Sequence, residues 1–189
     1  MAGRQRILDL GAGHGAVTGE LVRRGGAVVA VDAADDFLDL DPAPFRGAER
    51  VRAAASALPF RDESFDLVFC QLGLLWMGVE ALDEVRRVLA PGGAFAGIEP
   101  DYGGLLEWPR GGGDEAVARL RASGADVEVG RKVPGRLAEL GFRGVRAEVL
   151  SELDGRSGGW GLLGGSDGQR GGEWERLRWV PMVGVTGER

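Results

Sequence analysis

The sequence is poor in the residues that build metal clusters and disulfide frameworks. Its 189 residues include one cysteine, Cys70, and one histidine, His14, so a disulfide framework within the chain and a histidine metal cluster are both excluded. No apolar stretch approaches the roughly 20 residues that a membrane-spanning helix needs, and the N-terminus lacks the apolar run of a signal peptide. These absences predict a cytoplasmic protein with no metal and no membrane partner.

The sequence also lacks an excess of positive charge. Its formal net charge is −6, and Lys132 is the sole lysine. A protein that binds nucleic acid by neutralising phosphates needs the opposite balance, so no nucleic-acid partner is expected. The length fits one domain, residues 1–189, with a regular half at about 1–102 and a less regular half at about 103–189. A glycine-rich loop is predicted at 155–172.

The most informative stretch is ILDLGAGHGAVTGE, residues 7–20. It predicts a buried strand, a glycine turn and the start of a helix. Gly11 and Gly13 lack side chains, which permits a tight turn and a close approach of the backbone to a ligand. Glycine-rich turns also join strands to helices in α/β domains that bind nothing, so this motif alone is not specific.

Strands and helices are predicted to alternate along the first hundred residues. Apolar periodicity predicts helices at 14–24, 35–40, 79–89, 115–122 and 133–140, and strands at 27–31, 51–55, 64–71, 94–99, 145–150 and 180–185. This pattern is typical of a Rossmann-like, doubly wound α/β fold with a mostly parallel sheet. Residues 180–185 are expected to add an antiparallel edge strand.

Four segments together resemble the class I S-adenosylmethionine-dependent methyltransferases of the small-molecule type. ILDLGAGHG is similar to the first motif of that family, and VAVDAADDFL to the second. ASALPFRDESFDLVFCQLGLLWM resembles the stretch from the adenine loop through the fourth strand, and EVRRVLAPGGAFAGIEPD the helix, PGG turn and fifth strand. The resemblance covers about residues 5–102 well. It implies a cofactor-binding half at 1–102, S-adenosylmethionine as cofactor, and in-line methyl transfer to a small-molecule acceptor.

Two acidic residues are the main candidates for cofactor binding. Asp32 ends the second predicted strand, where a carboxylate can accept hydrogen bonds from a ribose diol; alternatively it caps a helix or a turn. Asp9 lies inside a buried strand and needs hydrogen-bond partners from the backbone or a ligand. The resemblance implies that Asp9 supports the methionine end of the cofactor, and the alternative is a carboxylate satisfied by the backbone alone.

The resemblance places other residues at the cofactor and the substrate. The cofactor set is Gly11, Ala12, Gly13, Ala33, Ala55, Ser56, Ala57, Cys70 and Gln71, although a small buried hydrophobe is the preferred interpretation of Cys70. The substrate set is Trp76, Glu99 and Tyr102; Tyr102 is the one catalytic candidate, as a group that orients substrate or relays a proton. For Trp76 and Tyr102 simple packing is an equal alternative, and His14 is interpreted as incidental.

The sequence departs from the family in two places, which keeps other functions open. Ala54 stands where many relatives have an aspartate for the adenine amino group, and few residues precede the first strand where relatives carry a helical lid. A homo- or hetero-oligomer is one expected source of that lid. The main alternative is a non-catalytic or degenerate S-adenosylmethionine-binding subunit of a larger methyltransferase. A third is an NAD-dependent oxidoreductase, because Gly11, Gly13 and Ala16 also fit the dinucleotide fingerprint.

Overall fold

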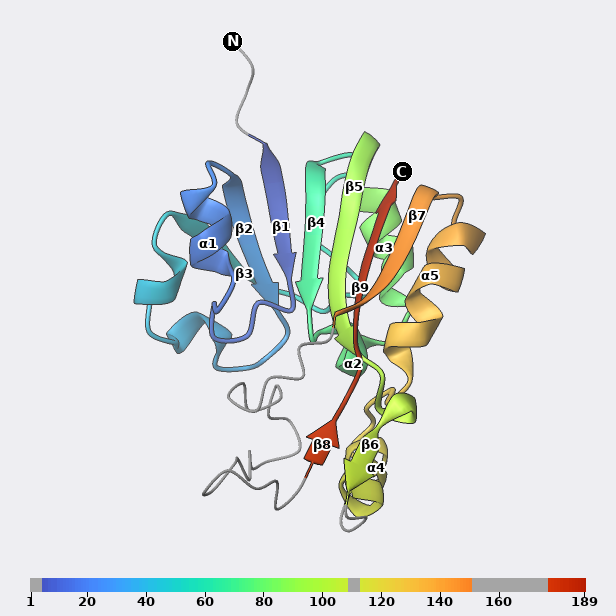
Figure 1. Ribbon diagram of the computed structural model, residues 1–189. Helices are drawn as coiled ribbons and strands as arrows, with labels where there is room; N and C mark the ends of the chain where they lie inside the picture. Colours follow the sequence, from blue (N-terminus) through green and yellow to red (C-terminus); the bar gives the residue numbers. More distant parts are fainter. Residues whose placement is uncertain (1–4, 109–112, 151–176) are drawn as a thin grey trace.

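A computed structural model describes residues 5–108, 113–150 and 177–189 of the chain (Figure 1). The predicted glycine-rich loop at 155–172 lies outside these residues. Seven strands form one sheet in the order β3-β2-β1-β4-β5-β9-β7. Their bounds are β1 Arg6–Leu10, β2 Ala27–Asp32, β3 Ala48–Arg52, β4 Phe65–Gln71, β5 Leu89–Pro100, β7 Arg143–Leu150 and β9 Met182–Glu188.

The sheet is parallel except where β9 takes part. Strands β3, β2, β1, β4 and β5 pair in parallel, whereas β9 runs antiparallel to both β5 and β7. This confirms the predicted α/β fold with a mostly parallel sheet and an antiparallel C-terminal strand. That strand lies one place in from the edge, because β7 pairs with its outer side.

Alternating strand residues send side chains to two different layers. Ile7 and Val28 pack with Leu21 of α1 (Thr18–Arg23) on one face, together with the short turns η1 (Phe37–Asp39) and η2 (Ala43–Phe45) nearby. Leu8 and its neighbours pack on the other face. That second layer holds α3 (Ala81–Val88) and α5 (Val129–Glu139). Among the described helices, none covers the α1-side face of β4, β5, β9 and β7 (Figure 1).

The predicted PGG turn lies inside β5 rather than before it. Helix α3 ends at Val88, one residue before the predicted end, and Leu89 already pairs with Phe65 of β4. The register then shifts, so that Leu67 pairs with Ala94. The glycines at 92 and 93 therefore form an irregular strand start instead of a separate loop.

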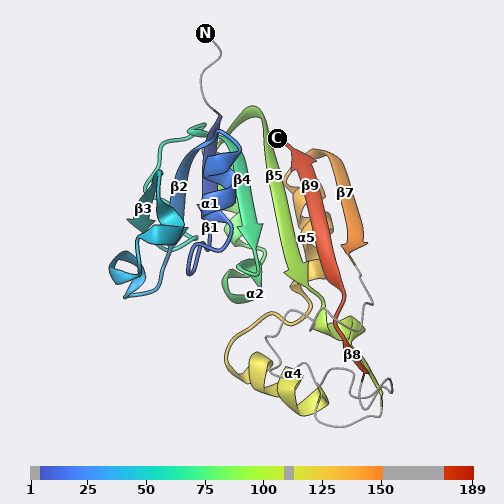
Figure 2. The same ribbon diagram turned by 60° about the vertical axis from the view of Figure 1, so that its left-hand side comes forward.

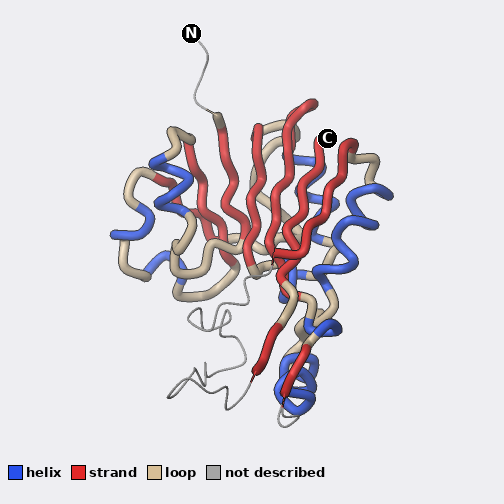
Figure 3. The backbone as a smooth tube through the Cα atoms, viewed as in Figure 1, coloured by secondary structure: helices blue, strands red, loops and turns tan. Residues whose placement is uncertain are grey.

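A small group of short elements lies beyond the carboxyl ends of the parallel strands (Figures 2 and 3). It consists of η3 (Tyr102–Gly104), β6 (Leu106–Trp108), α4 (Gly113–Ala122) and β8 (Leu177–Trp179). Strands β6 and β8 pair antiparallel, with Leu106 opposite Trp179. The pairing of β5 with β9 thus resumes beyond Pro100 as a two-stranded extension, which no pattern in the sequence indicated.

Candidate functional site

The turn after β1 carries three glycines in the left-handed region of the backbone. Gly11, Gly13 and Gly15 have φ values of 72°, 50° and 77°, which glycine adopts without the penalty that other residues incur. The N–H groups of Gly11 and Ala12 both donate to the carbonyl of Val31, at 2.8 and 3.0 Å. The turn is therefore fixed to the end of β2.

The first two glycines differ in the space beside them. A Cβ on Gly11 would lie 3.3 Å from the methyl carbon of Met77 and 3.4 Å from the Cα of Gly73. Protein atoms already fill that space. A Cβ on Gly13 would meet nothing within 4 Å, so the space beside Gly13 is open.

Gly15 is a part of the turn that the sequence reasoning missed. A Cβ there would lie 2.9 Å from the Phe45 ring and from the side chain of Pro44. Glycine at this position lets η2 pack directly on the turn. The available signal was the regular spacing of glycines at 11, 13 and 15.

Asp32 ends β2 beside this turn, and it is half-buried. Its Oδ2 accepts a hydrogen bond from the N–H of Gly13 at 2.9 Å, and its Oδ1 accepts one from the N–H of Ala34 at 3.0 Å. Because a carboxylate has about four lone-pair positions, both oxygens keep capacity for a ligand hydroxyl. Asp32 therefore caps the turn, which was the alternative interpretation of this residue. Its carboxylate also presents hydrogen-bond acceptors at the edge of the sheet.

Asp9 lies behind the turn and is 3% exposed. The hydroxyl of Thr18, the first residue of α1, donates to Asp9 Oδ2 at 2.6 Å. Burial raises the pKa of Asp9, the Thr18 hydrogen bond opposes that rise, and the charge of Asp32 adds to it. A side-chain hydroxyl is thus one partner of this buried carboxyl, a partner that was not expected from the sequence.

The loop that follows β3 lies next to Asp32. The N–H of Ala53 donates to the backbone carbonyl of Asp32 at 3.0 Å, and the N–H of Ala57 donates to Ala54 at 3.1 Å, which closes a turn. Ala55 is buried, whereas Ser56 and Ala57 are exposed. The structure therefore brings the predicted adenine loop and the predicted ribose acceptor to the same edge of the sheet.

Glu99 requires a correction, because it does not line an open pocket. Its carboxylate is 1% exposed and accepts hydrogen bonds from the N–H groups of Gly73, Leu74 and Leu75 at 3.0, 2.9 and 3.2 Å. Burial raises the pKa of Glu99 to about 7, although those three donors oppose the rise. Glu99 therefore supports the start of α2 (Leu74–Met77) instead of contacting substrate. Every second residue of β5 from 93 to 99 is buried, so Glu99 shares the inward face of the strand with Phe95.

Cys70 lies beside Glu99 at the end of β4. It is fully buried, and its thiol lies 3.5 Å from Glu99 Oε1. Burial, together with the neighbouring carboxylate, raises the pKa of the Cys70 thiol. The structure thus places Cys70 in the core, which agrees with its preferred interpretation as a small buried hydrophobe.

Tyr102 also requires a correction as the catalytic candidate. It is 4% exposed and belongs to the main hydrophobic core. Burial raises its pKa to about 12, which leaves the phenol unsuited to exchange protons near neutral pH. The physical reason is that the chain folds back at η3, where the N–H of Tyr102 donates to the carbonyl of Val127 at 2.8 Å.

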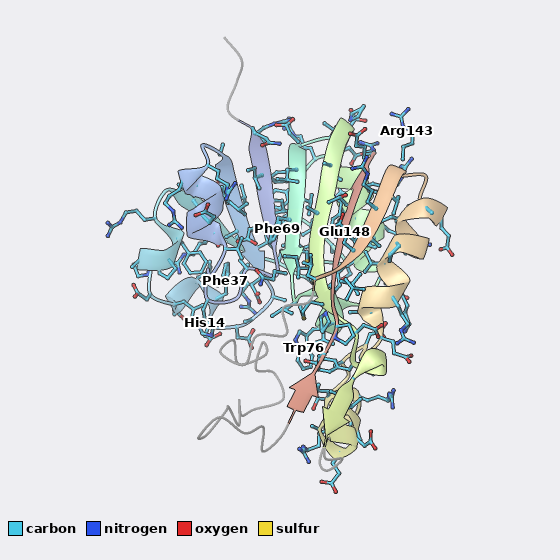
Figure 4. The ribbon with its side chains drawn as sticks, viewed as in Figure 1. His14, Phe37, Phe69, Trp76, Arg143 and Glu148 are labelled. Atoms are coloured by element: carbon cyan, nitrogen blue, oxygen red, sulfur yellow. The ribbon has the colours of Figure 1, made fainter. Side chains whose placement is uncertain are left out.

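The remaining predicted residues are accessible to different degrees. Ala33 is exposed and Gln71 half-buried, at the ends of β2 and β4. Trp76 is 49% exposed and lies beyond the carboxyl ends of the central strands, while His14 lies on the turn after β1 (Figure 4). Within the described ranges, no three His, Cys, Asp or Glu side chains gather as metal ligands would. No helix in the described part of the chain is long and apolar enough to cross a membrane.

The chain is similar to known methyltransferases in sequence. Residues 8–97 match a family described as a methyltransferase domain. An uncharacterized methyltransferase of Mycobacterium bovis is 37% identical over 110 residues, which are 58% of this chain and 45% of that protein. A malonyl-[acyl-carrier protein] O-methyltransferase of Halorhodospira halophila is 40% identical over 166 residues, 81% of this chain and 51% of that protein. The chain thus spans about half the length of these relatives.

Solved structures share the fold at low sequence identity. A putative methyltransferase from Bacillus halodurans superposes with a TM-score of 0.67 at 18% identity, over all of this chain and 94% of that one. An S-adenosylmethionine-dependent methyltransferase from Mesorhizobium loti gives 0.65 at 22% identity, over 99% and 92%. Both likenesses concern the arrangement of the whole chain, beyond the first hundred residues that carry the motifs.

Proposed function

We propose that this chain, which its methyltransferase-domain match at residues 8–97 and its relatives identify as a class I S-adenosylmethionine-dependent methyltransferase, methylates a small-molecule acceptor. One observation carries the proposal. The Asp32 carboxylate and the open side of Gly13 lie together at the carboxyl edge of the sheet, joined by a 2.9 Å hydrogen bond. Nucleotide ligands of doubly wound folds bind at this edge.

The residues at this edge fit the cofactor of the family. Asp32 retains acceptor capacity on both oxygens, which suits the two hydroxyls of a ribose. Gly13 leaves room where a side chain would stand. Ser56 and Ala57 offer small exposed groups on the neighbouring loop, which suits a flat base. In this proposal the ribose binds at Asp32 and the adenine at residues 55–57.

Asp9 has a supporting part in the proposed site. Its carboxyl is fixed by the Thr18 hydroxyl at 2.6 Å, directly behind the turn. Any negative charge on Asp9 favours a cationic group nearby, and the charge of Asp32 acts in the same sense. We assign to this pair the electrostatic attraction of the positively charged end of the cofactor.

The proposed reaction is an in-line displacement. S-adenosylmethionine supplies a methyl group on a sulfonium, which is already an activated donor. The protein therefore has to align the acceptor with that methyl group and to exclude water, and alignment alone contributes about 7–11 kcal/mol in favourable cases. Because the donor is already activated, this reaction depends on groups that bind and align the reactants. The burial of Tyr102, which makes it unsuited to relay a proton, agrees with this.

Trp76 is the proposed contact for the acceptor. It is 49% exposed and lies on α2, the first helix after β4, which Glu99 anchors. An exposed indole on an anchored turn offers a rigid apolar surface to a bound molecule. The relatives differ in what they act on, since one is named for a malonyl-[acyl-carrier protein] and another for demethylmenaquinone. We therefore propose a small-molecule acceptor without choosing between oxygen, nitrogen and carbon.

A cover over the acceptor remains part of the proposal. The segment that contains η3, β6 and α4 lies beyond the carboxyl ends of the central strands (Figure 2), where it can shield an acceptor from water. We propose that a second chain, of the same or another kind, completes the cover over the acceptor.

Calorimetric titration of the purified chain with S-adenosylmethionine, S-adenosylhomocysteine and NAD tests the proposal. We expect binding of the two sulfur compounds and no heat with NAD. Binding followed by methyl transfer to an acceptor from a screened set supports an enzyme, whereas binding with turnover only after a partner is added supports a subunit. Silence toward both sulfur compounds, or binding of NAD, contradicts the proposed function.

A further inference from the structure

The loop at residues 57–62 is held by one charged pair on α3. Glu84 and Arg87 lie three residues apart on this helix, with Arg87 Nε 2.6 Å from Glu84 Oε1 and Nη2 2.8 Å from Oε2. Both side chains are mostly covered, with 20% and 30% of their surfaces exposed. A bidentate pair of this kind fixes the orientation of the guanidinium.

Both members of the pair form hydrogen bonds with the backbone of the loop, Glu84 as acceptor and Arg87 as donor. Glu84 Oε2 accepts a hydrogen bond from the N–H of Leu58 at 2.8 Å, while Arg87 Nη2 donates to the carbonyl of Leu58 at 3.0 Å. Arg87 Nη1 also donates to the carbonyl of Phe60 at 2.8 Å and to the Asp62 carboxylate at 2.9 Å. The N–H group and the carbonyl group of Leu58 are thus both hydrogen-bonded to this pair.

These contacts begin directly after the exposed residues Ser56 and Ala57. Leu58 itself is 4% exposed, so its side chain anchors the loop from the core side while the charged pair anchors its backbone. Loops without such anchors sample many conformations, and ordering them on binding costs free energy. A loop that is already held presents its neighbouring residues without that cost.

We propose that Glu84 and Arg87 are positioning residues for the cofactor, because they preorganise residues 55–57 through the backbone of Leu58 and Phe60. The inference rests on the proposed function, in which that loop receives the adenine. Neither side chain touches the cofactor in this proposal. They act through the loop.

Arg86 provides a matched control on the same helix. It is exposed, and its Nε donates to the carbonyl of Leu140 at 2.7 Å, on the side of α5 rather than the loop. Arg86→Gln and Arg87→Gln therefore each remove one guanidinium from α3 and one charge from the protein. Only the second removes the guanidinium contacts with residues 58, 60 and 62.

The experiment measures S-adenosylhomocysteine binding by calorimetry and hydrogen exchange of the amides of residues 55–58 and 60 in the free proteins. We expect Arg87→Gln to raise the Kd about tenfold, the equivalent of one charged hydrogen bond left unmade, and to speed exchange in the loop. Arg86→Gln should leave both unchanged. If Arg87→Gln does not fold, Arg87→Lys carries the same test, because one ammonium cannot reproduce the fork of contacts.

Two results overturn the inference while the proposed function stands. One is faster loop exchange in Arg87→Gln with an unchanged Kd, and the other is equal weakening in the Arg86 and Arg87 variants. Failure of the unsubstituted protein to bind S-adenosylhomocysteine instead defeats the proposed function, and the inference with it.

Discussion

Asp32 is the single side chain on which the proposed cofactor site depends most. Replacing it by alanine removes both the acceptors for a ribose and the 2.9 Å bond from Gly13. We expect Asp32→Ala to weaken the binding of S-adenosylhomocysteine by about 1.5–3 kcal/mol, the range for a lost hydrogen bond to a charged group. Calorimetric titration of the folded variant measures this loss.

The exposed carboxylate of Asp39 provides the control for this substitution. It lies on η1, in the same connection between β2 and β3, and carries the same charge. Asp39→Ala should bind the cofactor as the unsubstituted protein does. Equal losses in the two variants would mean that general electrostatics, rather than a ribose contact, is what Asp32 supplies.

The buried carboxyl of Glu99 should make the free energy of unfolding depend on pH. Its pKa is about 7 in the folded protein, against 4.5 for the ordinary group, because burial disfavours the charge. Since the folded state retains a proton that the unfolded chain releases, the stabilisation is complete below about pH 4.5. It falls by roughly 3 kcal/mol as the pH rises to about 7, because a pKa difference of 1 between the folded and unfolded states corresponds to about 1.36 kcal/mol.

Urea unfolding of the unsubstituted protein and of Glu99→Gln from pH 4.5 to 8 measures this effect. The glutamine does not titrate, so the difference between their free energies of unfolding isolates Glu99. We expect that difference to shrink steadily up to about pH 7 and then to level off. A difference that is constant over the whole range would show that the pKa of Glu99 is the same in the folded and unfolded states, and it would contradict this prediction.

At the scale of elements, α5 contains two glycines in contrasting surroundings. A Cβ on Gly130 would lie 2.9 Å from the carbonyl oxygen of Pro100 and 3.1 Å from that of Glu99, so this glycine lets the helix pack on the end of β5. A Cβ on Gly135 would meet nothing within 4 Å. The two positions share one helix and differ in what lies beside them.

We expect the two alanine substitutions in α5 to have opposite signs. Gly135→Ala should raise the free energy of unfolding by about 0.5–1 kcal/mol through helix propensity. Gly130→Ala should lower it by about 1–3 kcal/mol, because the backbone of β5 must move. Urea unfolding at fixed pH measures both, and a stabilising Gly130→Ala would mean that the helix shifts without cost.

The longer elements could be predicted from the sequence, and the shortest could not. Helix α3 shows an apolar face over eight residues, and β1, β2 and β4 are mostly apolar runs of five to seven residues. By contrast α2 has four residues and β6 and β8 have three each, too few for any period to appear. They depend on distant partners, such as the Glu99 carboxylate that holds the start of α2.

The same distinction between local sequence and distant contacts applies to the candidate site. Asp32 and the glycine turn were predicted because strand ends in a parallel sheet meet at one edge, which local sequence determines. Glu99 and Tyr102 were placed in a pocket because they stand at the end of the predicted fifth strand and just after it, yet both are buried. The Glu84 and Arg87 contacts with Leu58 join segments 26 and 29 residues apart, and no local pattern reports such a pairing.

At the scale of the whole molecule, ligand binding should raise the free energy of unfolding. A ligand that binds only the folded state stabilises it by RT ln(1 + [L]/Kd), which is about 2.7 kcal/mol at a hundred times the Kd. We expect S-adenosylhomocysteine at that excess to raise the urea midpoint of the unsubstituted protein. NAD at the same concentration should leave the midpoint unchanged, and a shift with NAD would contradict the cofactor assignment.

The place of β9 has a consequence for the order in which the chain folds. Its residues pair with β5, so that Ala94 meets Glu188, and with β7 on the other side. Contacts between such distant residues form slowly, because the intervening chain loses entropy before they are made. During synthesis the strands β1 to β5 can assemble while β9 has yet to be made, and β7 has no partner in the sheet until then. The insertion of β9 is therefore the expected late event of folding, and a nascent chain that stops before it presents an unfinished edge to other chains.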